Sequence, residues 1–303
     1  MDFDKTCLDF EKRYGKKCDF VYFIGMPVIF FSSPAMTVGC AVSVGGYAAA
    51  RHRDDDRIII QFSDSDRFLN CSYAEMKHNK DEKIYDLFLK AERLGAKNCG
   101  AEILLRYNTK LSHPYREMLL CLMNGLCSKC PDTFELIKHF DNYESNTICM
   151  YSRKNHAEVF DGQQISYCPL SDSEVKIVIA DCGYEIMSVP ESPQEDTRKA
   201  AEALNCGDLA EFGRLLNRHY ASYFSEHHKK SAAAKLFNTA VNLGDAYGSG
   251  ITRDGRLYSI VKNSMADSYM QNLNREYKQY FGGSLDFYVT RAEDSGIRYV
   301  PEN

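Results

Sequence analysis

A closely spaced cysteine pair is the first motif in the chain that could do chemistry. Cys127 and Cys130 are separated by two residues, with Cys121 before them and His139 after them. Thiolate and imidazole groups can bind zinc, but a structural zinc site needs four ligands and usually takes them from two such pairs. We therefore favour ordinary thiols at a helix end and predict no metal site.

Two charged stretches are also candidates for binding a metal or a phosphate group. Residues 51–57 read Arg-His-Arg-Asp-Asp-Asp-Arg, and residues 227–230 read His-His-Lys-Lys. The first stretch lies between two strand-like segments and is interpreted as a charged hairpin turn. The second is interpreted as the exposed start of a helix. The sequence carries no Ser-His-Asp or Cys-His signature of a hydrolase.

The elements that position these side chains begin with strands. Residues 20–31 and 57–62 are rich in β-branched and aromatic side chains, which favour strands. Ile84, Leu87 and Phe88 begin an apolar pattern with helical spacing, and Gly95 is placed to cap that helix. This part of the chain is predicted to contain strands at 20–31, 57–62 and 101–107, an extended segment at 41–50, and helices at 84–94 and 115–126.

Helices dominate the second part. A strand-rich patch over 157–180 is followed by the polar, proline-containing residues 188–196, which are the best linker candidate. Because strands and helices occur in blocks, an α+β fold is favoured over a doubly wound sheet. We predict a strand-rich lobe over 1–187 and a helix-rich lobe over 188–303. The predicted elements are helices at 194–205, 208–220 (with Asp208 as N-cap), 231–243 and 266–281, and strands at 257–261 and 285–290.

Composition excludes several classes of function. The 303 residues carry a net charge of −5 with acids and bases mixed, unlike the one-sided basic surface that binds nucleic acid. No apolar run reaches the roughly 18 residues of a membrane helix, and the charged first residues lack the apolar core of a signal peptide. We expect a cytoplasmic protein whose 12 cysteines are reduced thiols.

Five collinear segments resemble a known family. Residues 203–217 (ALNCGDLAEFGRLLN) and 246–252 (AYGSGIT) look like the AL-x-x-GDL-x-x-FG-x-LMN and GVYGSRMT stretches of galactokinases. The other three are Lys154–Ala157 with Asp161, 179–183 and 281–289. The chain thus resembles the galactokinase family of the GHMP small-molecule kinases. This resemblance implies a two-lobed α+β fold that binds ATP and a sugar in the cleft between the lobes.

The family's catalytic positions are altered in this chain. The arginine that opposes the developing charge matches Pro27, and the Glu-His-Thr-Asp run that binds galactose matches residues 33–36 (Ser-Pro-Ala-Met). The catalytic aspartate matches Ser145. Glu144 is the nearest carboxylate and a weak candidate for a displaced base, although on a strand it would face away from Ser145.

The family's first glycine-rich phosphate loop has also lost its pattern. Residues 108–116 contain no glycine, and only Leu111 and Ser112 match. Pro114 donates no N–H but suits the first turn of a helix, so an ordinary helix start is favoured. Weak cofactor-binding candidates here are Leu111, Ser112 and His113, and a rebuilt anion site would use Lys110, His113 and Arg116.

The second glycine-rich loop keeps one glycine. Residues 253–258 read Arg-Asp-Gly-Arg-Leu-Tyr, so Gly255 remains as a weak cofactor-binding candidate. Arg256 and Tyr258 would fill space that a nucleotide needs. Asp254-Gly255 is interpreted as a turn between a helix and a strand.

These losses set three hypotheses against one another. The favoured one is a galactokinase-like pseudokinase without phosphotransferase activity or cofactor, which binds an unidentified protein partner or small-molecule ligand. The alternative is an active ATP-dependent sugar kinase with a rebuilt site, which would use Mg-ATP and the charged groups Lys110, Arg116, Glu144, Arg253 and Arg256. The third is a structural partner that oligomerises with an active paralogue.

Overall fold

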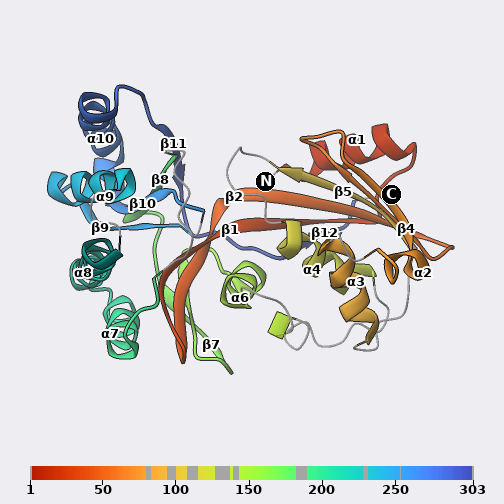
Figure 1. Cartoon of the computed structure of the whole chain (residues 1–303), viewed down its shortest axis with the longest axis horizontal. Coiled ribbons are helices and arrows are strands. Elements are labelled where there is room, and N and C mark those ends of the chain that lie inside the picture. Colours follow the sequence, from red (N-terminus) through yellow and green to blue (C-terminus); the bar gives the residue numbers. More distant parts are fainter. Residues whose placement is uncertain are drawn as a thin grey trace. The chain divides into compact units, whose positions relative to one another are not determined.

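The computed structural model describes residues 2–79, 83–93, 100–107, 115–126, 137–138, 143–181, 190–227, 231–252 and 254–301. Helices and strands form the α+β arrangement that the sequence predicts (Figure 1). The strands are β1 (Phe20–Ser33), β2 (Met36–Arg53), β3 (Arg57–Phe62), β4 (Phe68–Ser72), β5 (Gly100–Tyr107), β6 (His156–Phe160), β7 (Ile165–Pro169), β8 (Val175–Asp181), β9 (Ala246–Ile251), β10 (Leu257–Lys262), β11 (Asp286–Thr290) and β12 (Ile297–Tyr299). The helices are α1 (Phe3–Tyr14), α2 (Tyr73–Met76), α3 (Lys83–Arg93), α4 (Tyr115–Leu126), α6 (Tyr143–Tyr151), α7 (Gln194–Asn205), α8 (Leu209–His227), α9 (Ala232–Leu243), the 3₁₀ turn η1 (Asn263–Met265) and α10 (Ala266–Phe281).

The chain forms two compact units, each assembled from separate segments. Unit 1 contains Met1–Met26, Val44–Tyr151 and Ser295–Asn303, and unit 2 contains Pro27–Ser43 and Ser152–Asp294. The long strands β1 and β2 therefore contribute residues to both units. This partition differs from the predicted division at 187/188, because two stretches before that boundary belong with the later helices.

In unit 1 the strands separate two hydrophobic cores. Phe20, Tyr22 and Ile24 of β1 pack in one core, whereas Val21 and Phe23 pack in the other. Successive side chains of a strand point to opposite faces, so a strand that is buried on both faces must be apolar at every position. This explains the continuous apolar run from Phe20 that the sequence shows.

Helices cover both faces of this sheet. Helix α1 lies on one side, and α3 and α4 lie on the other (Figure 1). The first core contains side chains of α3 and α4, and the second contains Phe10 of α1. Arg106 of β5 fixes α1 by donating to Thr6 Oγ1 (3.0 Å) and Asp2 Oδ2 (3.1 Å) and by pairing with Asp9.

The charged stretch at residues 51–57 is not a hairpin turn, so that prediction is wrong. Strand β2 ends at Arg53 and β3 begins at Arg57, but β5 lies between them in the sheet. Glu102 of β5 sits opposite Arg51 and accepts hydrogen bonds from Arg51 and Arg53. The basic side chains thus bind the strand that separates β2 from β3.

Unit 2 is built around the sheet β11-β8-β10-β9, whose neighbouring strands are all antiparallel. Helix α8 packs most closely on β9. A Cβ atom built on Gly213 of α8 would lie 2.0 Å from the carbonyl oxygen of Tyr247, so this contact requires a residue without a side chain. Strands β6 and β7 extend the other sheet next to Thr37–Gly39 of β2.

Most helices begin and end close to where the sequence predicts. Helices α4, α7 and α10 have the predicted bounds, and the Asp208 carboxylate accepts the Glu211 N–H at 2.9 Å, as the predicted N-cap. Helix α8 runs on to His227 because the buried Phe224 continues the apolar face from Tyr220. Of the stretch 227–230, which the sequence predicts to be a helix start, His227 ends α8, and residues 228–230 lie outside the described residues.

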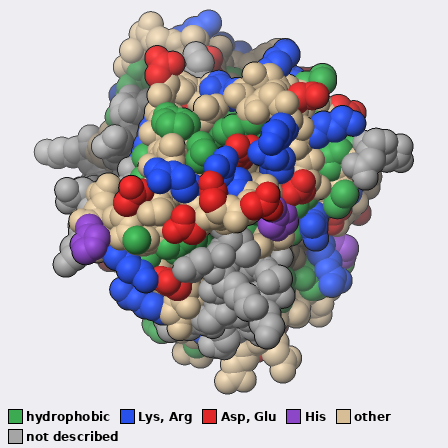
Figure 2. Space-filling model, turned by 90° about the vertical axis from the view of Figure 1, so that its right-hand side faces the viewer, with side chains coloured by type: hydrophobic (Ala, Val, Ile, Leu, Met, Phe, Trp, Pro, Cys, Tyr) green, Lys and Arg blue, Asp and Glu red, His purple; other side chains and the backbone are tan. Residues whose placement is uncertain are grey.

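The described surface carries mixed charge. Basic and acidic side chains alternate over the face seen in Figure 2. Among the helices that the structure describes, none has the length and apolar character to cross a membrane.

Candidate functional site

The position that matches the family's catalytic base is buried in a helix. Ser145 lies on α6 and is 7% exposed, and Glu144 beside it is half-buried. Because both residues lie on a helix, the alternation of a strand that would point Glu144 away from Ser145 does not apply. Residues 145–149 are all buried, so α6 has no polar face and no amphipathic pattern to reveal it. A serine hydroxyl at this point cannot replace a carboxylate base at neutral pH.

The positions that match the arginine and the galactose-binding run form a strand and its hairpin turn. Pro27 is half-buried in β1 and has neither a charge nor a backbone N–H. Ser33 and Met36 close the turn between β1 and β2, because the Ser33 hydroxyl donates to the Met36 carbonyl (3.0 Å) and accepts its N–H (3.1 Å). The Ser33 hydroxyl is therefore engaged in backbone hydrogen bonds within the turn.

The first phosphate-loop candidates cannot be placed. Lys110, Leu111, Ser112 and His113 lie outside the described residues, and so does the side chain of Arg116. The same holds for the side chains of the cysteine pair and its flanking residues, Cys121, Cys127, Cys130 and His139. No metal-binding cluster is found in the part of the chain that the structure does describe.

The second phosphate-loop candidate, Gly255, lies in the turn between strands β9 and β10, so the predicted turn is present but joins two strands instead of a helix and a strand. Its φ of +87° requires glycine. Its N–H donates to the Thr252 carbonyl (2.9 Å), the Thr252 N–H to the Arg256 carbonyl (2.7 Å), and the Arg256 N–H to the Thr252 hydroxyl (3.0 Å). A phosphate-binding loop needs backbone N–H groups that point outward. The N–H groups of Thr252, Gly255 and Arg256 do not point outward in this way, because each donates within the turn.

Two carboxylates lie close to the arginine side chain of the same turn. Arg256 pairs with Asp254 and lies 3.5 Å from Asp181 Oδ2. Its positive charge is thereby balanced within the protein. Tyr258 is fully buried and donates its hydroxyl to the Ile29 carbonyl at 3.2 Å. The residues that replace the family's glycines therefore serve the packing of unit 2.

Glu158 is a buried acid that sequence reasoning missed. It is 1% exposed on β6, and burial raises its pKa from the ordinary 4.5 to about 8. The Ser152 hydroxyl donates to one carboxyl oxygen (2.6 Å) and the Arg153 N–H to the other (3.0 Å). Ser152 in turn accepts the Ala41 N–H at 2.6 Å. The only sequence signal is an acid inside the apolar strand His-Ala-Glu-Val-Phe.

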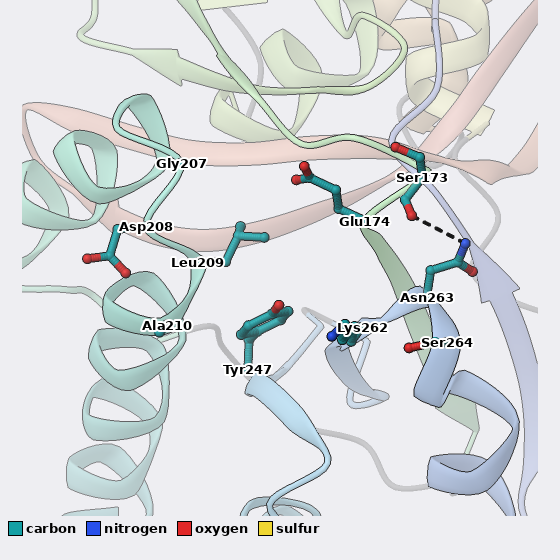
Figure 3. A pocket seen from close by; sticks show the side chains of 10 residues that line it. All are labelled: Ser173, Glu174, Gly207, Asp208, Leu209, Ala210, Tyr247, Lys262, Asn263 and Ser264. Carbon is teal, nitrogen blue, oxygen red and sulfur yellow. Dashed lines mark hydrogen bonds between the residues drawn. The ribbon is translucent and has the colours of Figure 1, made fainter.

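A polar pocket of about 760 Å³ lies within unit 2. Tyr247, Leu209 and Glu174 face its interior in Figure 3, whereas Asp208 points away. Lys262 brings a positive charge from the end of β10. The lining offers a cation, a carboxylate and an aromatic ring, which suits a small polar ligand. None of the predicted site residues that the structure describes lines this pocket. Its lining residues are Ser173, Glu174, Gly207, Asp208, Leu209, Ala210, Tyr247, Lys262, Asn263 and Ser264.

Part of the chain is similar in sequence to galactokinases. No family model matches the chain. A galactokinase of Roseiflexus sp. (strain RS-1) is 33% identical over 109 residues, which span 35% of this chain and 28% of that protein. A galactokinase of Fusobacterium nucleatum is 30% identical over 104 residues, or 33% and 27% of the two chains. The chain thus aligns with little more than a quarter of these relatives.

Solved structures share the fold over nine-tenths of this chain or more. The Lactococcus lactis galactokinase complexed with galactose superimposes with a TM-score of 0.83 and 13% identity, covering 96% of this chain and 98% of that one. The chain is galactokinase-like and has the GHMP kinase fold. The Methanococcus jannaschii mevalonate kinase has a TM-score of 0.59 and 10% identity, covering 90% and 98%.

The galactokinase-like motifs that remain are packing positions. Gly213 allows α8 to touch β9, and the Asn217 side chain on the next turn accepts the Ser249 N–H at 2.9 Å. Ser249 contacts the Ser259 hydroxyl at 2.8 Å inside the sheet. Gly213 and Asn217 fall in the galactokinase-like segment 203–217, and Ser249 falls in the segment 246–252, so these motifs maintain the framework.

Proposed function

We propose that this chain is a galactokinase-like pseudokinase that binds a ligand or a protein partner and transfers no phosphoryl group. The relationship to galactokinases supplies the fold, and the altered positions argue against the chemistry. Phosphoryl transfer depends on positioned donors and charges around the moving group. A chain that lacks them at the matched positions has little means to catalyse it.

The observation that carries the proposal is the turn around Gly255. The backbone N–H groups of Thr252, Gly255 and Arg256 all donate to acceptors within the turn, and the Arg256 side chain is paired with carboxylates. Opening it to receive phosphates would break these bonds before any contact with a ligand formed. The buried Ser145 at the matched base position points the same way, because removing a catalytic group costs orders of magnitude in rate.

Thermal unfolding with Mg-ATP tests the proposal. A ligand at 100 times its dissociation constant adds about 2.7 kcal/mol to the free energy of unfolding. We expect millimolar Mg-ATP to leave the midpoint of this protein unchanged and to raise that of the Lactococcus lactis galactokinase measured in parallel. We also expect no ADP release with galactose or other hexoses.

The active-kinase alternative makes the opposite prediction. It requires a magnesium-dependent rise in the midpoint and hexose-dependent ADP release. If Glu144 is the displaced base, that release falls by orders of magnitude in Glu144→Gln. Ser145→Ala is the matched control and should leave it unchanged. Hexose-dependent turnover in the wild-type protein would overturn the pseudokinase proposal.

A further inference from the structure

Two cysteines of unit 1 lie in contact with each other. Cys7 is on α1 and Cys18 is just before β1, and their Sγ atoms are 3.5 Å apart. Cys18 is 5% exposed and belongs to the core beneath α1, whereas Cys7 is half-buried at the edge of that core. The two thiols are therefore adjacent, and one of them is reachable from solvent.

The end of α1 brings the sulfurs together. Gly15 takes a φ of +68°, and its N–H donates to the Glu11 carbonyl at 2.8 Å, which ends the helix. The chain then turns back beneath the helix toward β1. Tyr14 holds this geometry by donating its hydroxyl to the Ile103 carbonyl of β5 at 2.7 Å.

We propose that Cys7 and Cys18 are a redox-sensitive pair that closes into an intramolecular disulfide on exchange with a low-molecular-weight disulfide such as oxidised glutathione. In the first step the Cys7 thiolate attacks the disulfide, forming a mixed disulfide and releasing one thiolate. In the second step the Cys18 thiolate attacks the Cys7 sulfur and releases the second thiolate. The protein loses two protons and two electrons, and the small disulfide becomes two thiols.

The geometry sets the order and the pace of this exchange. A disulfide needs sulfurs about 2.05 Å apart, so the pair must approach by side-chain rotation and a small movement of α1. Cys7 is the entry point because it is the more exposed thiol. Burial raises the pKa of Cys18 to about 12 and also raises that of Cys7. Thiolates are therefore scarce at neutral pH, and the exchange is slow.

Closure would lock α1 to the beginning of β1. The helix is otherwise held on the sheet by side-chain contacts, which include those of Phe10, the Tyr14 hydroxyl and Arg106. A disulfide that closes a short loop restricts the unfolded chain more than the folded one. Oxidation should raise the unfolding midpoint by about 5 °C.

Peptide mapping of the full chain tests this proposal. The reduced protein is incubated with oxidised glutathione, quenched with acid, and digested with trypsin. We expect a crosslink between the peptide of residues 6–12 and that of residues 18–51. Fragmentation must assign the second sulfur to Cys18, because the buried Cys40 lies in the same peptide.

Variants separate the pair from other thiols. Cys7→Ser and Cys18→Ser should each abolish the crosslink and the rise in midpoint, while Cys206→Ser, which removes an exposed cysteine, should retain both. The wild-type map decides the matter even if a variant fails to fold. A stable glutathione adduct on Cys7, or no reaction at either residue, would overturn the proposal. Neither outcome bears on phosphoryl transfer.

Discussion

At the scale of single residues, Glu158 makes stability depend on pH. Its folded pKa of about 8 lies above the ordinary 4.5, so between these values the folded state binds more protons than the unfolded state. The free energy of unfolding therefore falls as pH rises through this window. We expect a loss of roughly 2–4 kcal/mol between pH 4.5 and 8 from this group.

Replacing Glu158 by glutamine should remove that slope while keeping the acceptor for the Arg153 N–H. Unfolding midpoints of the wild type and Glu158→Gln, measured from pH 5 to 9, should differ least at the acid end of that range and diverge with rising pH. Glu174→Gln, at an exposed carboxylate, is the control and should follow the wild type. An unchanged slope in Glu158→Gln would place the pH dependence elsewhere.

The same scale shows what local sequence can reveal. Asp208 is recognisable as an N-cap because its partner, the Glu211 N–H, lies three residues away. The raised pKa of Glu158 depends on burial of its side chain, and its hydrogen bond depends on Ser152. Cys7 and Cys18 meet only because α1 ends between them. A single sequence carries no sign of such partners.

At the scale of elements, the contact between α8 and β9 is the tightest that the structure describes within unit 2. Gly213→Ala would place a Cβ atom 2.0 Å from the Tyr247 carbonyl oxygen, so the helix must shift away from the strand. We expect a loss of roughly 2–4 kcal/mol in the free energy of unfolding. Denaturant unfolding measures this loss. Arg214→Ala, on the exposed side of α8, should change it little, and an equal loss in both variants would contradict the packing argument.

Element predictions succeed where burial follows a simple period. Helices α4, α7 and α10 match the predicted bounds because their apolar residues recur with helical spacing. Helix α6 was not predicted, because five consecutive residues of it (145–149) are buried and leave no helical period in the sequence. Helix α1 was not predicted either, because many of its residues are charged and its apolar face, which includes Phe10, is narrow.

At the scale of the whole molecule, the units are interleaved along the chain. Strand β8 pairs with β10 and β11, which follow it by more than seventy residues. A cut at 187/188 separates these strands and exposes their hydrogen-bonding edges. We therefore expect the fragments 1–187 and 188–303 to be unfolded when expressed alone and to regain structure when mixed.

Circular dichroism during thermal unfolding checks this expectation. Each fragment should melt without a cooperative transition, and the intact chain should melt cooperatively. A cooperative transition in either isolated fragment would show that the continuous lobes predicted from the sequence fold independently.

The sequence by itself determined the α+β class, most helices and the relationship to galactokinases. These features rest on local periodicity and on collinear motifs such as those around Gly213 and Ser249, which a chain displays without being folded. Only the tertiary structure decided that β5 lies between β2 and β3 and that Cys7 touches Cys18. It also decided that backbone N–H groups of the Gly255 turn donate to carbonyls of the same turn. These features arise from contacts between residues distant in sequence or from the path of a turn, neither of which leaves a periodic pattern.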